Sequence, residues 1–139
     1  MKRLGKLMIL ASVLVLSMAC TKEQTRIGFQ THCSTVDVDS DGDGTMESVD
    51  FTLNVDYVED VTDFYDRVTL VWEGMQVLEA DSLPVAYTTN ISLLYDSVYT
   101  FNIKGEWSNG SSSGDLNIWV KDGHMYYTEI VEMFDFTIR

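Results

Sequence analysis

The segment from Asp37 to Asp50, DVDSDGDGTMESVD, gathers the residue types that bind hard cations. Aspartates stand at every second position from 37 to 43, and Gly42 and Gly44 allow the chain to bend back on itself. Calcium takes about six to eight oxygen ligands, so several aspartates around a glycine bend suit it. The segment therefore predicts a calcium site, and the alternative is a solvated acidic turn without an ion.

Two registers of this loop supply different ligands. A loop that starts at Asp37 bends at Gly42 but places Ser48 at its last ligand position, where an acid is expected. A loop that starts at Asp39 bends at Gly44 and is the better of the two. Its predicted ligands are Asp39, Asp41, Asp43, Thr45 through its carbonyl, Glu47 directly or through water, and Asp50.

The loop resembles the calcium loop of dockerins and, more loosely, that of thrombospondin type 3 repeats. The resemblance implies a structural calcium ion. A dockerin loop continues into a helix and occurs twice, whereas this loop occurs once and an alternating pattern follows Asp50. Cohesin binding therefore does not carry over.

The element that follows the loop is a strand. Apolar residues alternate with polar residues from Val49 to Tyr57, which is the pattern of a half-buried β-strand. Because successive side chains point to opposite faces, Asp50 lies on the face away from Val49 and Phe51, where it can serve the metal site.

Further strands follow at short spacing. Alternation predicts them at 67–73, 75–80, 85–91, 99–103 and 116–120, and the Asp122-Gly123 pair predicts a hairpin turn into a long final strand. About seven short strands with polar turns predict an all-β fold, an antiparallel immunoglobulin-like β-sandwich. A small barrel or a jelly roll is the alternative.

Part of this pattern resembles a known family. Ser97, Tyr99, Phe101, Ile103 and Gly105, preceded by Leu93, resemble the corner and following strand of fibronectin type III domains. The segment 68–72, VTLVW, is similar to the second strand of those domains. The resemblance covers two strands and implies a sandwich fold.

Two tryptophans are candidate ligand-binding residues. Trp107 and Trp119 lie in predicted strands near the C-terminus, and Trp119 falls on the face opposite Leu116, Ile118 and Val120. An exposed indole can stack on a sugar ring or fill a pocket of a partner. Burial under loops and edges of the sandwich is the alternative.

Two apparent catalytic motifs lack the context that catalysis needs. Gly110-Ser-Ser-Ser-Gly114 fits the nucleophile-elbow pattern around Ser112, but that motif needs a following helix, and here we expect a hairpin tip. His32 stands next to Cys33, and adjacent residues rarely converge as a nucleophile and its base must. We therefore expect no enzymatic activity.

The charge of the chain excludes one class of partner. The 139 residues carry 22 Asp and Glu against 9 Lys and Arg, a formal net charge of −13 at pH 7. Such a surface repels phosphate backbones, so nucleic acid is not an expected partner. It attracts cations or a basic partner.

The first twenty residues resemble the export signal of a bacterial lipoprotein of the type found in the Bacteroidetes. Lys2, Arg3 and Lys6 precede an uncharged, mostly apolar stretch at 7–19, which is too short to span a bilayer. Ala19 then precedes Cys20, although Ser17 stands where a lipobox usually has Leu. The resemblance implies cleavage before Cys20 and its lipidation, and an ordinary secretory signal is the alternative.

The expected organisation has three parts: a signal peptide at 1–19, the lipidated Cys20 with a tether at 20–35, and a β-sandwich domain with an N-terminal acidic loop at 36–139. Cys33 is then the only thiol left, whereas an unmodified Cys20 would be available for a disulfide with it. Thr21 after the cysteine is similar to the sorting context of outer-membrane lipoproteins.

These features predict a non-enzymatic, calcium-stabilised binding or assembly module. It would be anchored in the cell envelope by its lipid, at the outer membrane and facing the periplasm or the surface. Its partner is an unknown protein or glycan. The alternatives are a carbohydrate-binding module that uses its exposed aromatic residues and a secreted binding domain without a lipid.

Overall fold

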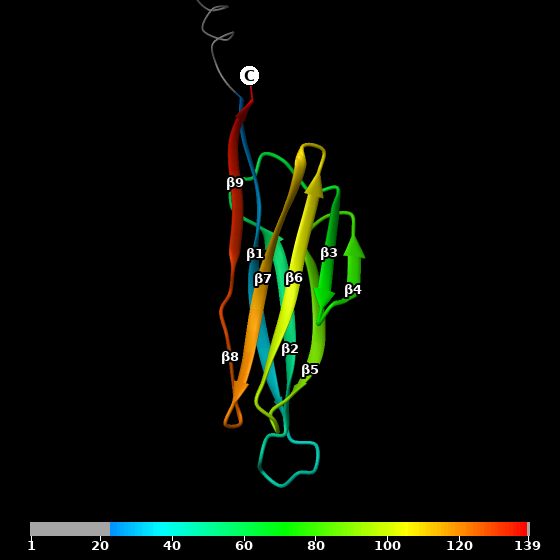
Figure 1. Ribbon diagram of the computed structural model, residues 1–139, viewed down its shortest axis with the longest axis vertical. Coiled ribbons are helices and arrows are strands. Elements are labelled where there is room, and N and C mark those ends of the chain that lie inside the picture. Colours follow the sequence, from blue (N-terminus) through cyan, green and yellow to red (C-terminus); the bar gives the residue numbers. More distant parts are fainter. Residues whose placement is uncertain (1–22, 139) are drawn as a thin grey trace, which may run out of the picture.

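The computed structural model of the chain describes residues 23–138 (Figure 1). The signal segment 1–19 and Cys20 lie outside these residues. The described part contains nine strands: β1 (Glu23–Val38), β2 (Ser48–Tyr57), β3 (Arg67–Trp72), β4 (Met75–Ala80), β5 (Val85–Ser92), β6 (Ser97–Trp107), β7 (Gly110–Lys121), β8 (His124–Tyr127) and β9 (Val131–Ile138). No helix among the described residues is long and apolar enough to cross a membrane.

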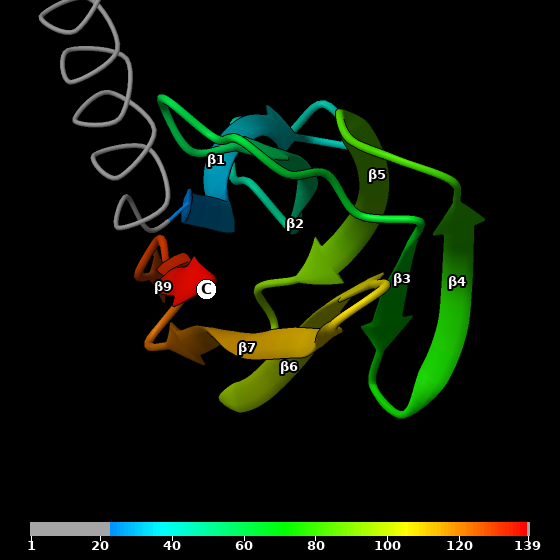
Figure 2. The ribbon, with the colours of Figure 1, turned by 90° about the horizontal axis from the view of Figure 1, so that it is seen from above.

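The nine strands form two antiparallel sheets that pack face to face. One sheet has the order β5-β2-β1-β9, and the other has the order β4-β3-β6-β7-β8. Figure 2 shows the two layers, with β9 at one side of the sandwich. The predicted β-sandwich is confirmed, and the sheets do not close into a barrel.

Six of the first seven strands are shared between the sheets as in immunoglobulin-like sandwiches. The first, second and fifth strands lie in one sheet, and the third, sixth and seventh lie in the other, as in constant-type domains. The fourth strand differs, because it pairs with the third instead of joining the first sheet. Val68–Trp72, compared above with a second strand, is part of β3, the third strand. The β8 and β9 strands then add one strand to each sheet, so the count is nine rather than seven.

The predicted tether at 20–35 is wrong from Glu23 onward, because those residues form most of β1. This strand lies inside its sheet, with β2 on one side and β9 on the other. Its inward face carries Thr25, Ile27, Phe29, Thr31 and Cys33, all buried. Two threonines and a cysteine on that face hide the apolar alternation that marks a strand in the sequence.

The core fills the space between the sheets with large side chains from both. The Phe51 ring of β2 stacks on the Phe101 ring of β6 with 6.1 Å between their centroids. The ring centroids of Trp72 of β3 and Phe101 are 4.3 Å apart. Leu53, Leu70, Ile103, Leu116 and Ile118 are fully buried around them. This core holds the ends of the strands, and therefore the loops between them, in fixed positions.

Two tight turns agree with the sequence. Asp122 and Gly123 both have positive φ, 52° and 77°, and form the predicted hairpin turn between β7 and β8. Glu73 and Gly74 also have positive φ and form the turn between β3 and β4. Two successive positive φ angles give the turn whose twist matches a two-residue hairpin. The long final strand predicted after the Asp122-Gly123 turn is wrong, because β8 ends at Tyr127 and the chain continues as β9 in the other sheet.

Candidate metal centre

The acidic loop connects the end of β1 to the start of β2, at the end of the sandwich opposite Glu23 (Figure 1). Its base is closed by the pairing of Val38 with Ser48 and by the Glu47 N–H, which donates to the Val38 carbonyl at 3.1 Å. The Glu47 carbonyl accepts a hydrogen bond from the Leu93 N–H at 2.8 Å. The loop is therefore tied to the sheet and to the neighbouring connection between β5 and β6.

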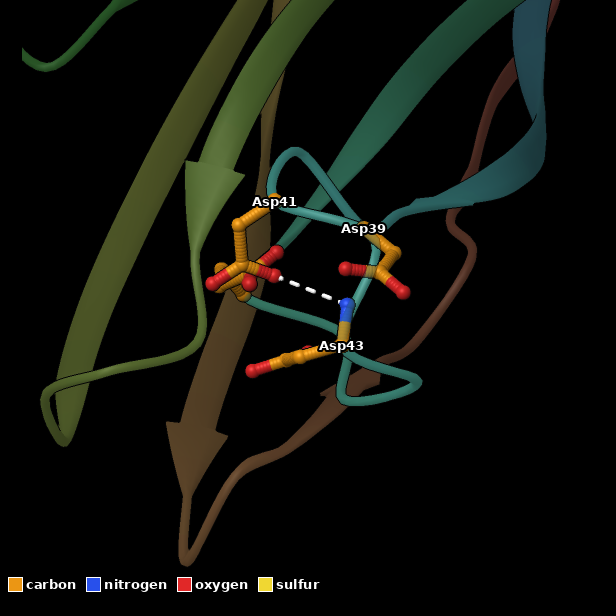
Figure 3. A group of neighbouring side chains, drawn as sticks. Asp39, Asp41 and Asp43 are labelled. Carbon is orange, nitrogen blue, oxygen red and sulfur yellow. Dashed lines mark hydrogen bonds between the residues drawn. The ribbon is translucent and has the colours of Figure 1, made fainter.

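Hydrogen bonds within the loop curl it around its own carboxylates (Figure 3). Asp39 accepts from the N–H groups of Gly42 and Gly44, at 2.9 and 2.7 Å. The Asp41 carboxylate accepts from the Asp43 N–H at 3.1 Å. Gly42 and Gly44 have φ of 73° and 88°, which L-residues adopt at a cost, so the glycines make this curl possible.

The curl brings four carboxylates together. Asp39, Asp41, Asp43 and Glu47 each offer an oxygen, and these oxygens all lie within 4.8 Å of one another. Asp41 and Asp43 are exposed, while Asp39 and Glu47 are half-buried. Four carboxylates in this space could hold a metal ion, and their oxygens are ligands for hard cations.

The carboxylates also affect one another's protonation. A hydrogen bond with Glu47 lowers the pKa of Asp41, with a smaller contribution from the Asp43 N–H. The Ser40 N–H lowers the pKa of Glu47, but the hydrogen bond with Asp41, desolvation and the Asp41 charge together raise it above its ordinary value. The charge of Asp41 thus disfavours the charged form of Glu47, and a cation between the two carboxylates would relieve that repulsion.

One oxygen of the group lacks a partner. Glu47 Oε2 accepts from the Ser40 N–H at 2.9 Å, whereas the other carboxylate oxygen, Oε1, is buried and has no hydrogen-bond partner. A buried oxygen of this kind costs free energy unless a donor or a cation meets it.

Two predicted ligands lie differently. Thr45 is in the loop, and its N–H donates to the Asp43 carboxylate at 2.7 Å. Asp50 points from the outer face of β2 and accepts a hydrogen bond from the Asn90 side chain at 2.9 Å. It is not among the four close carboxylates. The structure therefore brings together four of the six predicted ligands and places Asp50 beside Asn90 of β5.

The two tryptophans differ in burial. Trp107 is only 8% exposed, and its ring lies against Tyr65 and Phe134. Trp107 lies on the inward face of β6, two residues after Gly105 in the alternating series of Phe101, Ile103 and Gly105. This alternation could have predicted from the sequence that Trp107 is buried. Of the two alternatives for Trp107, ligand binding and burial, the structure shows burial.

Trp119 lies on the outer face of β7 and is 40% exposed. Its cross-strand neighbours are Val98 of β6 and Tyr126 of β8, which are also exposed. Trp119 borders a shallow hollow of about 330 Å³ together with Asp96, Ser97 and Lys121. This row is an exposed apolar and aromatic surface with polar groups beside it.

The apparent catalytic residues do not converge. Ser112 lies within β7 rather than at a hairpin tip, and its hydroxyl is hydrogen-bonded to the Tyr65 hydroxyl at 3.1 Å. The turn is at Ser108 and Asn109. The His32 side chain is 84% exposed, whereas the Cys33 side chain is buried on the opposite face of β1. These two neighbours cannot form a nucleophile and base.

Cys33 is a free, buried thiol. Burial, and then the charge of Glu129, raise its pKa to about 12. Ten residues of extended chain separate it from Glu23, roughly 33 Å. Cys20 lies three residues before Glu23 and can add only about 11 Å of reach. With β1 intact, the disulfide between Cys20 and Cys33 cannot form within one chain.

No protein-family model and no curated protein sequence matches this chain.

Proposed function

We propose that this chain is an exported, non-enzymatic lipoprotein whose domain is stabilised by calcium at the loop between β1 and β2 and acts as a binding or assembly module. The four carboxylates of that loop carry the proposal. Their oxygens lie within 4.8 Å of one another, where mutual repulsion disfavours the loop until a cation neutralises it.

Calcium fits this loop better than other common ions. Asp39, Asp41, Asp43 and Glu47 supply only hard oxygens, which suit calcium or magnesium rather than a metal that prefers nitrogen or sulfur. Magnesium demands a near-ideal octahedron and keeps several waters, whereas calcium accepts an irregular set of carboxylates, carbonyls and water. The exposure of Asp41 and Asp43 leaves room for water, so we expect weak affinity of the extracellular kind, with Kd on the order of 10⁻⁴ to 10⁻³ M.

Calorimetry and thermal melting test this site. Calcium added to the chelator-treated protein should bind with one ion per chain and raise Tm, and magnesium should do so less. Asp39→Asn and Glu47→Gln should abolish both effects. Glu59→Gln, in an exposed turn at the other end of β2, is the matched control. Absence of heat together with an unchanged Tm would overturn the proposed site.

Asp50→Asn separates the observed geometry from the sequence-based ligand set. The Asp50 carboxylate accepts from Asn90, so its replacement should leave calcium affinity nearly unchanged. A loss as large as that of Asp39→Asn would show that Asp50 is a ligand after all.

The proposed anchor is supported by the residues before β1. Lys2, Arg3 and Lys6, the apolar stretch and Cys20 form the signal, and Thr21 favours sorting to the outer membrane. Mass spectrometry of the mature protein should find a lipid-modified N-terminal Cys20. An unmodified N-terminus downstream of Cys20 would mean that the protein is secreted and not anchored.

A second candidate function, glycan binding, is favoured by the Trp119 row. Trp119 and Tyr126 are cross-strand neighbours on an exposed face, and Ser97, Asp96 and Lys121 supply hydrogen-bonding groups beside the indole. Sugar rings stack on exposed aromatic side chains. On a glycan array, binding should fall with Trp119→Ala but not with Tyr95→Ala, a more exposed aromatic residue in the loop before β6. Binding that ignores Trp119→Ala, or no binding, would discard this function.

A further inference from the structure

The outer face of the β5-β2-β1-β9 sheet contains a groove that neither the calcium loop nor the Trp119 row explains. It has a volume of about 740 Å³, within the range of ligand sites. Residues of β1, β2, β5 and the link before β9 line it, among them Gln30, His32, Asn54, Asp56, Ala86 and Glu129.

Each amide side chain of the groove has one of its two N–H donors engaged. Asn54 Nδ2 donates to the His32 carbonyl at 3.1 Å, and Gln30 Nε2 donates to the Tyr57 carbonyl at 3.3 Å. A backbone carbonyl only accepts, so these bonds fix which end of each amide is nitrogen. The oxygens Asn54 Oδ1 and Gln30 Oε1 are then the ends that remain as acceptors.

Two carboxylates add to these acceptors. Asp56 accepts from the Tyr57 N–H at 2.7 Å, and Glu129 Oε1 accepts from the Cys33 N–H at 2.7 Å, which holds its carboxylate beside β1. The Thr31 hydroxyl is engaged with both backbone groups of Ile130. No Lys or Arg is among the residues that line the groove.

The groove therefore carries two carboxylates and two amide oxygens, and its one imidazole, that of His32, lies 3.9 Å from Glu129 Oε1. Pro84, Val85, Ala86 and Val131 give it apolar walls. A guanidinium group carries five N–H donors and one positive charge and has no acceptor. The aliphatic stem of arginine packs against apolar surface while its head meets carboxylates.

We propose that this groove binds an arginine side chain presented by an extended segment of a partner protein. The guanidinium lies between Asp56 and Glu129, and its stem lies over Pro84 and Ala86. The groove is separate from the calcium loop, so this interaction does not depend on calcium binding or on the lipid.

Titration of the isotopically labelled protein, followed by NMR with calcium in excess, tests the proposal. The probe is the blocked tripeptide acetyl-Ala-Arg-Ala-amide. Its citrulline analogue has the same shape without the charge, and free L-arginine carries an additional carboxylate. The tripeptide should shift the amide signals of residues 30–32, 54–56, 85–86 and 129–131, and bind more tightly than either control compound.

Three variants locate the site. Asp56→Asn and Glu129→Gln keep an acceptor oxygen for the bonds to Tyr57 and Cys33, and each should weaken the affinity roughly three-fold at low salt. Ala86→Leu fills the groove from an exposed position and should abolish binding. Asp115→Asn, on the other sheet, is the matched control and should change nothing.

Three results would overturn the proposal. The citrulline analogue or free arginine could bind as tightly as the tripeptide, the signal changes could spread over both sheets, or Ala86→Leu could bind like the unmodified protein. The last result is informative because Ala86 lies outside the core, and the amide spectrum reports whether the variant is folded.

Discussion

The Tyr65 ring lies directly on Gly105, so closely that a Cβ added at position 105 would overlap the ring. Tyr65 is held in place by its hydroxyl, which is hydrogen-bonded to Ser112 at 3.1 Å, and by its N–H, which donates to the Tyr57 hydroxyl at 3.0 Å. The ring also packs against Trp107. The connection between β2 and β3 thus packs against the β4-β3-β6-β7-β8 sheet through the contact of Tyr65 with Gly105.

Gly105→Ala should destabilise the domain by about 1 to 3 kcal/mol, because Tyr65 must move and its contacts weaken. Urea denaturation measures this loss. Gly110→Ala is the control, since a Cβ there would lie 3.5 Å from the Trp107 ring, an ordinary contact. Equal stability of the two variants would show that Tyr65 moves at little cost.

The sequence predicted the strands whose inward positions are apolar. Val49, Phe51, Leu53 and Val55 of β2 alternate without interruption, and they are all buried. It missed β1, whose inward positions include Thr25, Thr31 and Cys33. A central strand can carry such residues because the Thr31 hydroxyl is satisfied by Ile130, a partner far along the chain that no local pattern reveals.

The acidic loop was also predictable only where its geometry depends on neighbouring residues in the sequence. Asp39, Asp41 and Asp43 gather through hydrogen bonds within the loop, which depend only on local spacing and on the two glycines. The place of Asp50 depends on Asn90 of β5, a pairing partner that the sequence does not identify. Local geometry could be predicted here, whereas cross-strand geometry could not.

The reassignment of β1 from tether to strand makes a direct prediction. Ile27 is fully buried, so Ile27→Ala should lower the free energy of unfolding by about 2 to 5 kcal/mol. Val36→Ala, in the same strand but 66% exposed, should change it by less than about 0.5 kcal/mol. Urea denaturation compares the two. A small effect at Ile27 would mean that this stretch is a tether.

The Cys33 thiol should be protected from reaction and should make stability fall in alkali. Burial and Glu129 raise its pKa from 9.0 to about 12, so the native state holds the thiol proton more tightly than the unfolded state. This contribution to stability is complete below pH 9 and is lost as the pH rises toward 12. Cys33→Ala should remove the part of the stability loss at alkaline pH that Cys33 causes, as urea denaturation at several pH values would measure.

Reaction with a disulfide reagent at about pH 8 measures the same property, because the thiolate is the reacting form. The native thiol should react slowly and the urea-unfolded thiol rapidly. Rapid reaction of the native protein would contradict the buried position of Cys33.

The final prediction concerns orientation and rests on the proposed lipid anchor. Only Thr21 and Lys22 separate Cys20 from β1, so a lipid on Cys20 places Glu23 within about 11 Å of the membrane surface. The β1 strand has 16 residues and spans about 50 Å, with the acidic loop at its other end. A lipidated Cys20 would therefore hold the start of β1 and the end of β9 close to the bilayer. The acidic loop, at the other end of β1, would point away from it.

Fluorescence quenching from labelled lipid headgroups tests this orientation. The turn between β6 and β7 lies at the same end of the sandwich as the start of β1, whereas the turn between β7 and β8 lies at the end of the acidic loop (Figure 1). Ser108 is in the first of these turns, and His124 directly follows the second. A fluorophore attached through Ser108→Cys should be quenched strongly in vesicles, and one attached through His124→Cys weakly, while the buried Cys33 stays unlabelled. Equal quenching at the two positions, with lipidation confirmed by mass, would mean that the domain lies flat or moves freely on its anchor.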